Sequence, residues 1–86
     1  MKLKIGDTAQ AGPIYQQVKN GIEAMISSNQ LKSGEMLPRA SDVARENKIA
    51  EGEVVRAYYE LVVGGILTKV QKKNMFGEPM VEHTVK

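Results

Sequence analysis

The 86-residue chain contains no cysteine and no tryptophan, and its only histidine is His83. The lack of cysteine excludes disulfide bridges and thiolate-bound metals, and it favours a reducing, cytoplasmic location. A metal site at His83 is not expected, because the polar tail around it offers no partner ligands. No apolar run approaches the ~20 residues of a membrane span, and the first ten residues lack the apolar core of a signal peptide. We therefore expect a soluble protein without metal, cofactor or membrane contact.

A strong excess of one charge is also missing. Twelve Lys and Arg residues against ten Asp and Glu give a net charge of +2, which falls short of the strongly basic character of a dedicated nucleic-acid binder. The length corresponds to one small domain that buries only ~60% of its unfolded surface. No nucleophile accompanied by a base, no carboxylate pair in an apolar frame and no phosphate-binding glycine loop is present. We expect no catalytic residues.

The first half of the chain predicts an arm and one long helix. Residues 1–12 alternate weakly, at Leu3 and Ile5, and are expected to form a short strand or a loose N-terminal arm. A helix over residues 13–28 follows, because Pro13 suits the first helical position. Its core stripe repeats at helical spacing and consists of Ile14, Val18, Ile22, Met25 and Ile26. Within this helix Gly21 costs ~1 kcal/mol relative to alanine, which suggests close approach of another helix.

The second half predicts two further helices and a hairpin. A short helix is expected over residues 40–47, with Val43 and Ala44 facing inward, and a longer one over residues 51–63, ended by Gly64-Gly65. Residues 66–70 are expected to form a strand, residues 71–74 a polar turn, and Met75-Phe76 the start of a return strand. The tail at 78–86 either extends that hairpin or is disordered. The fold class is therefore mainly α with a small β-hairpin, a three-helix winged helix-turn-helix over residues 13–77.

The helix predicted over residues 51–63 has two apolar arcs. At ~100° per residue, Val54, Ala57, Tyr58 and Leu61 share one arc, expected to pack on Ile22 and Ile26 of the first helix. A second arc consists of Val55, Tyr59, Val62 and Val63. A helix apolar over roughly two-thirds of its circumference must bury its second face against something. These four residues are therefore the candidate protein-contact surface, with Tyr59 as the candidate anchor.

The charged residues leave several alternatives. Glu51 and Glu53 begin this helix, where a carboxylate either accepts from cytosine N4 or stabilises the helix dipole, and the dipole role is favoured. Arg56 is a DNA-contact candidate, although an ion pair with Glu60 at i+4 is favoured. The remaining DNA-contact candidates are Arg39, Lys69, Lys72 and Lys73. Their side chains either hold phosphates or are simply solvated.

Framework residues between positions 13 and 76 carry a family resemblance. They are Pro13-Ile14-Tyr15-Gln16-Gln17-Val18, Leu31, Gly34, Leu37-Pro38, Asp42-Val43-Ala44, Arg56-Ala57-Tyr58, Glu60-Leu61, Gly65-Ile66-Leu67 and Phe76. This pattern resembles the N-terminal domain of GntR-family transcription regulators, in particular the YtrA-like branch. The resemblance implies a winged helix-turn-helix that binds DNA. Family members usually carry a further domain or helices for effector binding and dimerisation, and this chain is too short for either, so no small-molecule effector domain is expected.

The chain departs from the family pattern where the family touches DNA. The usual Pro-Ser-x-Arg before the second helix is Pro-Arg-Ala-Ser at 38–41, which places Ser41 at the position of the phosphate-binding arginine. The recognition helix begins with Ala-Glu-Gly-Glu at 50–53 instead of polar or basic residues. The wing at 70–76 lacks both glycines and both leading arginines of the family's wing.

Two functions follow from these observations. In the first, the recognition helix has become a contact surface for a protein partner or a second copy of the chain, in transcription regulation or a role derived from it. The alternative is a repressor-like regulator that binds DNA as a dimer through its basic wing and helix-turn-helix.

Overall fold

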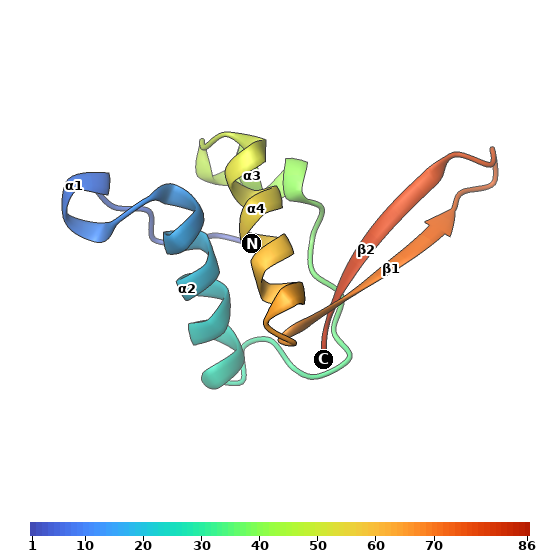
Figure 1. The fold of residues 1–86 in the computed structure, drawn as a ribbon, viewed down its shortest axis with the longest axis horizontal. Helices are drawn as coiled ribbons and strands as arrows, with labels where there is room; N and C mark the ends of the chain where they lie inside the picture. Colours follow the sequence, from blue (N-terminus) through green and yellow to red (C-terminus); the bar gives the residue numbers. More distant parts are fainter.

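The computed structural model describes residues 1–86 as four helices followed by a two-stranded hairpin. The elements are α1 (Thr8–Ala11), α2 (Ile14–Ser27), α3 (Ala40–Asn47), α4 (Glu51–Val63), β1 (Leu67–Lys73) and β2 (Pro79–Val85). Both α2 and α3 pack against α4, and the hairpin projects away from the helices on the side of α4 opposite α2 (Figure 1). This arrangement is a winged helix-turn-helix, as the sequence predicts. None of the four helices combines the length and apolar character that a bilayer crossing requires.

The two helices of the helix-turn-helix lie where the sequence pattern places them. The bounds of α3 and α4 agree with the predicted ranges, and Val43 and Ala44 are buried. Between them Lys48 adopts a left-handed conformation (φ 55°) that ends α3. The start of α2 differs slightly from expectation, because Pro13 has an extended ψ of 149° and is the N-cap residue, not the first helical residue.

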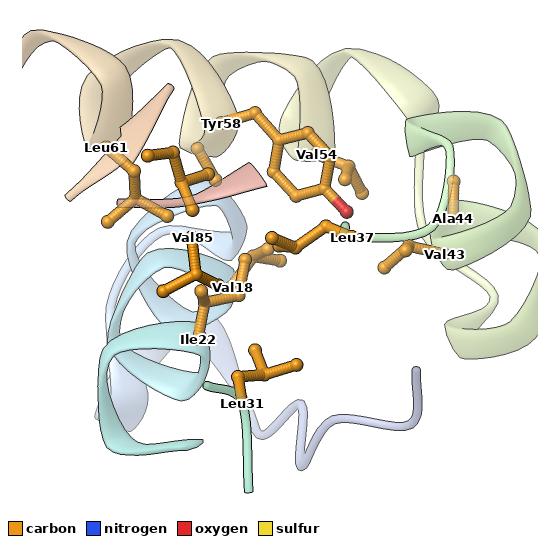
Figure 2. Close-up of a cluster of buried hydrophobic side chains, with 12 residues drawn as sticks. Val18, Ile22, Leu31, Leu37, Val43, Ala44, Val54, Tyr58, Leu61 and Val85 are labelled. Atoms are coloured by element: carbon orange, nitrogen blue, oxygen red, sulfur yellow. The ribbon is translucent and has the colours of Figure 1, made fainter. Parts of the chain in front are cut away.

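The core forms where α2, α3 and α4 meet the base of the hairpin, as Figure 2 shows. Val54, Ala57, Tyr58 and Leu61 of α4 are all buried, which confirms the predicted inward arc. Ile22 of α2 is fully buried with them. Ile26 is half-buried at the edge of the same cluster. Leu67 and Val85 close the core from the hairpin. The helix α4 therefore lies at the centre of the core and packs against both α2 and α3.

The N-terminal arm is neither a strand nor loose. A four-residue helix, α1, lies within it, and the Asp7 carboxylate caps this helix by accepting a hydrogen bond from the Ala9 N–H at 2.9 Å. The buried side chain of Gln17 in α2 holds the arm, with Oε1 accepting from the Gly6 N–H at 2.7 Å and Nε2 donating to the Gly6 and Gly12 carbonyls. Short helices of this kind have no apolar period for a sequence pattern to detect.

A second amide holds the beginning of the arm. Asn47 at the end of α3 accepts from the Leu3 N–H at 2.7 Å and donates to the Met1 carbonyl at 2.9 Å. The arm thereby reaches α2, where a Cβ built on Gly21 would lie 3.1 Å from Leu3 Cδ2. Our expectation of a close helix at Gly21 is wrong, because the close neighbour is the arm.

The hairpin is longer than the sequence predicts. β1 continues to Lys73 and β2 begins at Pro79, with pairs running from Leu67↔Val85 to Lys73↔Pro79. The predicted turn at 71–74 and the predicted return strand at Met75-Phe76 are therefore wrong. Backbone hydrogen bonds extend the ladder through polar, exposed residues, where no hydrophobic alternation marks the strand. The turn lies at residues 74–78, and Gly77 supplies its positive φ of 77°.

The segment before α3 adds a third partner at the base of the hairpin. Leu37 N–H donates to the His83 carbonyl at 2.8 Å, and Val85 N–H donates to the Glu35 carbonyl at 2.9 Å. Met36 forms an isolated bridge with Thr84. These bonds fix β2 next to the start of α3 and thereby set the position of the wing relative to α4.

Candidate functional site

A groove lies between α4, the segment leading into α3, and the hairpin, and its volume is about 920 Å³. One wall is formed by Val55, Tyr59 and Val62 of α4. Met36 and Val81 contribute apolar side chains on the other side. We refer to this groove below as the wing groove.

The residues of the predicted second arc of α4 do not share one surface. Val55, Tyr59 and Val63 are 50%, 66% and 70% exposed, so three of its four members are solvated in the monomer. Val62 is half-buried and packs against the core. Val63 lies outside the wing groove, beside Lys19 and Glu60, and Tyr59 borders both surfaces. The contact surface expected from sequence is thus a groove wall plus one exposed valine beside it.

Two aromatic rings that line the wing groove, those of Tyr58 and His83, pack against each other. The Tyr58 hydroxyl donates to the Pro38 carbonyl at 2.9 Å, and the Tyr58 ring packs against the His83 ring with centroids 4.7 Å apart. Burial raises the pKa of Tyr58, which keeps the phenol protonated. Burial, and secondarily the charge of Lys69, lowers the pKa of His83 and favours neutral imidazole. Sequence reasoning placed His83 in a polar tail and missed this packing role.

The wing groove is lined by residues of both charges. Arg39 and Lys69 line it, together with Asp42, Glu51, Glu78 and Glu82. Lys72 pairs with Glu82 across the hairpin at 3.2 Å. Lys73 is exposed next to the turn and forms no ion pair. Arg39, Lys69 and Lys73 are therefore cations on this side of the molecule that remain free to meet an anionic partner.

Arg56 lies away from the wing groove. Its Nε donates to Glu60 Oε2 at 3.3 Å, and its guanidinium lies over the Tyr15 ring, 3.7 Å from the centroid. The ion pair favoured by the sequence pattern is present. Because an arginine stacked on an aromatic ring is already engaged on both sides, the structure gives Arg56 a role between α4 and α2.

Two neighbouring carboxylates at the start of α4 have different roles. Glu53 is half-buried, and its Oε2 accepts a hydrogen bond from the Tyr15 N–H at 2.8 Å. Pro13 provides no capping side chain for α2, so the first N–H groups of that helix need another acceptor. Glu53, which lies 38 residues farther along the chain than Tyr15, accepts from one of them. Glu51 is exposed, lines the wing groove and forms no ion pair.

Glu53→Ala should therefore lower the free energy of unfolding by about 1–2 kcal/mol, since it removes a cap and a charge-assisted hydrogen bond. Glu51→Ala is the matched control, with an expected change within about 0.5 kcal/mol. Urea unfolding followed by circular dichroism measures both. Equal destabilisation by the two variants would show that Glu53 acts only through the dipole of its own helix.

The described residues contain no group of three or more His, Cys, Asp or Glu side chains that is arranged to hold a metal ion. The wing groove is lined by carboxylates, two cations and apolar side chains.

Comparisons with known proteins agree on one family. The profile of "Bacterial regulatory proteins, gntR family" matches residues 14–76. Among solved structures, the chain is similar to YtrA from Sulfolobus acidocaldarius, a GntR-family transcription factor, with 31% sequence identity and a TM-score of 0.79. That match covers 98% of this chain and 79% of the YtrA chain. No curated protein sequence matches the chain.

Proposed function

The chain belongs to the GntR family of bacterial regulatory proteins, and from this premise we propose that it is a non-enzymatic transcription regulator that binds DNA. The proposed contacts come from the wing and from the residue before α3. This proposal rests on one observation: the unpaired cations Arg39, Lys69 and Lys73 lie on the side of α4 that bears the wing.

The chemistry of this surface favours phosphate contact over base recognition. Lysine and arginine gain affinity for DNA by neutralising phosphates and releasing counterions. The residue that α4 offers at its exposed start is Glu51, whose carboxylate repels phosphate and whose one useful base contact is cytosine N4. We therefore expect weak and mostly non-specific binding, with a Kd on the order of 10⁻⁴–10⁻⁶ M at physiological salt.

A salt-titrated fluorescence anisotropy assay with a labelled duplex tests this function. Affinity should fall steeply as salt rises, and scrambling the duplex sequence should change it little. An absence of binding even at low salt would rule out the DNA-binding proposal. Specific nanomolar binding to one duplex that is lost on Glu51→Ala would contradict the phosphate-contact mode, because the carboxylate would then be reading a base.

A second function is favoured by the exposed apolar residues of α4. We infer that Val55, Tyr59, Val62 and Val63 contact a protein partner or a second copy of the chain. Val55, Tyr59 and Val63 are exposed in the monomer, and such clustered apolar exposure on a small domain is typical of an interaction surface. An aromatic residue beside smaller apolar neighbours is a frequent anchor of such surfaces.

If this surface is an interface, Tyr59→Ala should weaken association by about 2 kcal/mol or more. The variant should fold normally, because Tyr59 is largely outside the core. Sedimentation equilibrium of the variant beside the original protein measures association, and a thermal melt checks folding. A wild-type protein that stays monomeric at high concentration and captures no partner would refute this second function.

A further inference from the structure

The turn at residues 74–78, which we call the wing tip, carries the two most exposed large apolar side chains of the molecule. Met75 is 90% exposed and Phe76 is 79% exposed. The wing tip is the end of the hairpin farthest from the helices (Figure 1). Neither residue belongs to the core cluster or packs against it. The monomer therefore gains no apolar burial from these side chains, which is typical of residues that contact a partner.

Hydrogen bonds within the wing tip hold it in one arrangement. Asn74 Oδ1 accepts hydrogen bonds from the Phe76 N–H at 2.9 Å and the Glu78 N–H at 3.0 Å. The Asn74 N–H donates to the Glu78 carbonyl at 3.0 Å, and the Gly77 N–H donates to the Asn74 carbonyl at 2.9 Å. Because the turn is already ordered, its two apolar side chains lose less entropy when a partner receives them.

One lysine lies on each face of the hairpin directly behind the wing tip. Lys73 is opposite Pro79 and Lys72 is opposite Met80, and successive side chains of a strand point to opposite faces. Lys73 forms no ion pair. The pair between Lys72 and Glu82 at 3.2 Å is partly exposed, so it contributes little and leaves the ammonium able to change partners. The hairpin therefore ends in apolar side chains with a cation on either face.

The two carboxylates of the hairpin limit what charge alone can contribute to an interaction with phosphate. Glu82 is paired with Lys72, and Glu78 Oε1 accepts a hydrogen bond from Asn74 Nδ2 at 3.2 Å within the wing tip. Both carboxylates still repel phosphate, so they offset part of the attraction that the lysines provide. The two apolar side chains of the wing tip are the groups that can add affinity without depending on charge.

A DNA duplex offers an apolar site for such a tip between its stacked base pairs. Phenylalanine and methionine are among the side chains that proteins insert between base steps, which partly unstacks the step and kinks the duplex by ~20–90°. The minor groove through which they enter is ~6 Å wide, and a phosphate backbone lies on each side of it. A hairpin end with one lysine on each face matches this arrangement, because each ammonium then lies beside a different strand.

We propose that the wing tip is a wedge, which inserts Phe76 between two base pairs with Met75 packed beside it and thereby bends the bound duplex. Lys72 and Lys73 hold the phosphate backbones on either side of the inserted turn. This inference rests on the proposed DNA-binding function and adds the form of DNA that the domain selects, a kinked duplex. Since a mismatched base pair costs less to unstack, a duplex with a mismatch is the preferred ligand.

DNA bending provides the first test. A duplex of about 25 base pairs with a dye on each end reports its end-to-end distance by resonance energy transfer. Transfer should rise when the protein saturates the duplex, to the value of a bend of ~20–90°. The double variant Met75→Ser/Phe76→Ser should bind more weakly and leave the saturated duplex straight. Phe76→Leu, which keeps an apolar side chain at the wing tip, should still bend it.

The matched control for these variants is Val70→Thr. Val70 is another exposed apolar residue of the hairpin, but it lies in the middle of β1 and not in the wing tip. Threonine keeps the branched side chain that a strand favours, so this variant should bend DNA as the original protein does. Thermal melts of all variants should coincide, because none of the substituted residues belongs to the core cluster.

Base unstacking provides the second test. The adenine analogue 2-aminopurine, placed at the centre of an unlabelled duplex, fluoresces more strongly when it leaves the base stack. The original protein and Val70→Thr should raise this fluorescence at saturation, whereas Phe76→Ser should not. The original protein should also bind a duplex with one central mismatch at least about fivefold more tightly than the fully paired duplex. Phe76→Ser should bind the two duplexes alike.

The failure of the wedge and the failure of DNA binding give different results. If the original protein binds DNA without bending it or unstacking the central base, the wedge is overturned and the DNA-binding function stands. An absence of binding by anisotropy at low salt refutes that function and the wedge with it. Vesicles of phosphatidylglycerol and phosphatidylcholine test the other surface that receives apolar and basic groups. Cosedimentation with these vesicles that is lost on Phe76→Ser, while DNA binding is unchanged, would also overturn the wedge.

Discussion

Leu61→Ala should lower the free energy of unfolding by about 2–5 kcal/mol, the range measured for leucine-to-alanine changes in protein cores. Leu61 is fully buried on the face of α4 that packs against α2, among the largest buried side chains of the domain. Since small domains have ~5–15 kcal/mol of stability in total, the loss is a large fraction. Each kcal/mol lowers the Tm of such a domain by roughly 4–8 °C, so thermal unfolding by circular dichroism should show a fall of at least about 8 °C.

The matched control is Val63→Ala, two residues farther along the same helix. Val63 is largely exposed, and alanine has the higher helix propensity, so stability should change little or rise slightly. Denaturation of both variants under the same conditions separates core packing from helix propensity. Similar melting points for the two would show that the helical phase of α4 is misassigned, and the exposed arc would then have to be redrawn as well.

Charge reversal at the wing should abolish DNA binding. In the double variant Lys72→Glu/Lys73→Glu, two cations of the wing become anions, which would remove counterion release and add repulsion toward phosphate. The single variants should differ. Lys72 already pairs with Glu82, whereas Lys73 has no ion pair, so Lys73→Glu should weaken binding more. Anisotropy titrations at several salt concentrations measure both affinity and salt slope, and undiminished binding by the double variant would place the phosphate contacts elsewhere.

The two glutamates of α4 should respond differently to the reverse change. Glu51→Lys should strengthen DNA binding, because Glu51 is exposed and its carboxylate meets phosphate with like charge. Glu53→Lys also removes a negative charge, but it breaks the hydrogen bond to the Tyr15 N–H and should destabilise the domain. Weaker DNA binding by Glu51→Lys would indicate that this carboxylate accepts a hydrogen bond from a base.

The sequence predicts most of the helical frame for identifiable reasons. The helices around Val54, Leu61 and Val43 have apolar residues at helical spacing and clear ends, at Gly64-Gly65 and around Lys48. These signals are local. The family resemblance adds the topology, since it places the framework residues of α2, α4 and β1 in one arrangement.

What the sequence does not predict depends on contacts between distant residues. The wing continues through Gln71 and Lys73 by backbone pairing, and such pairing leaves no apolar alternation in the sequence. Glu53 caps a helix that begins 38 residues earlier. His83 packs on Tyr58 because β2 is held against the segment before α3. Each of these features becomes visible only when the chain is folded.

The two amides that hold the N-terminal arm, Gln17 and Asn47, have a consequence for local unfolding. Together they fix the N–H groups of Gly6 and Leu3 to two different helices. Met1, Leu3 and Ile5 pack against the core, but none of them is fully buried. The arm should therefore open as one cooperative unit, at a lower free energy than the whole domain. In native-state hydrogen exchange, the Leu3 and Gly6 amides would then exchange together and well before those of α4. This domain would have a detachable segment on the side of its helices away from the wing, whose opening leaves the winged helix intact.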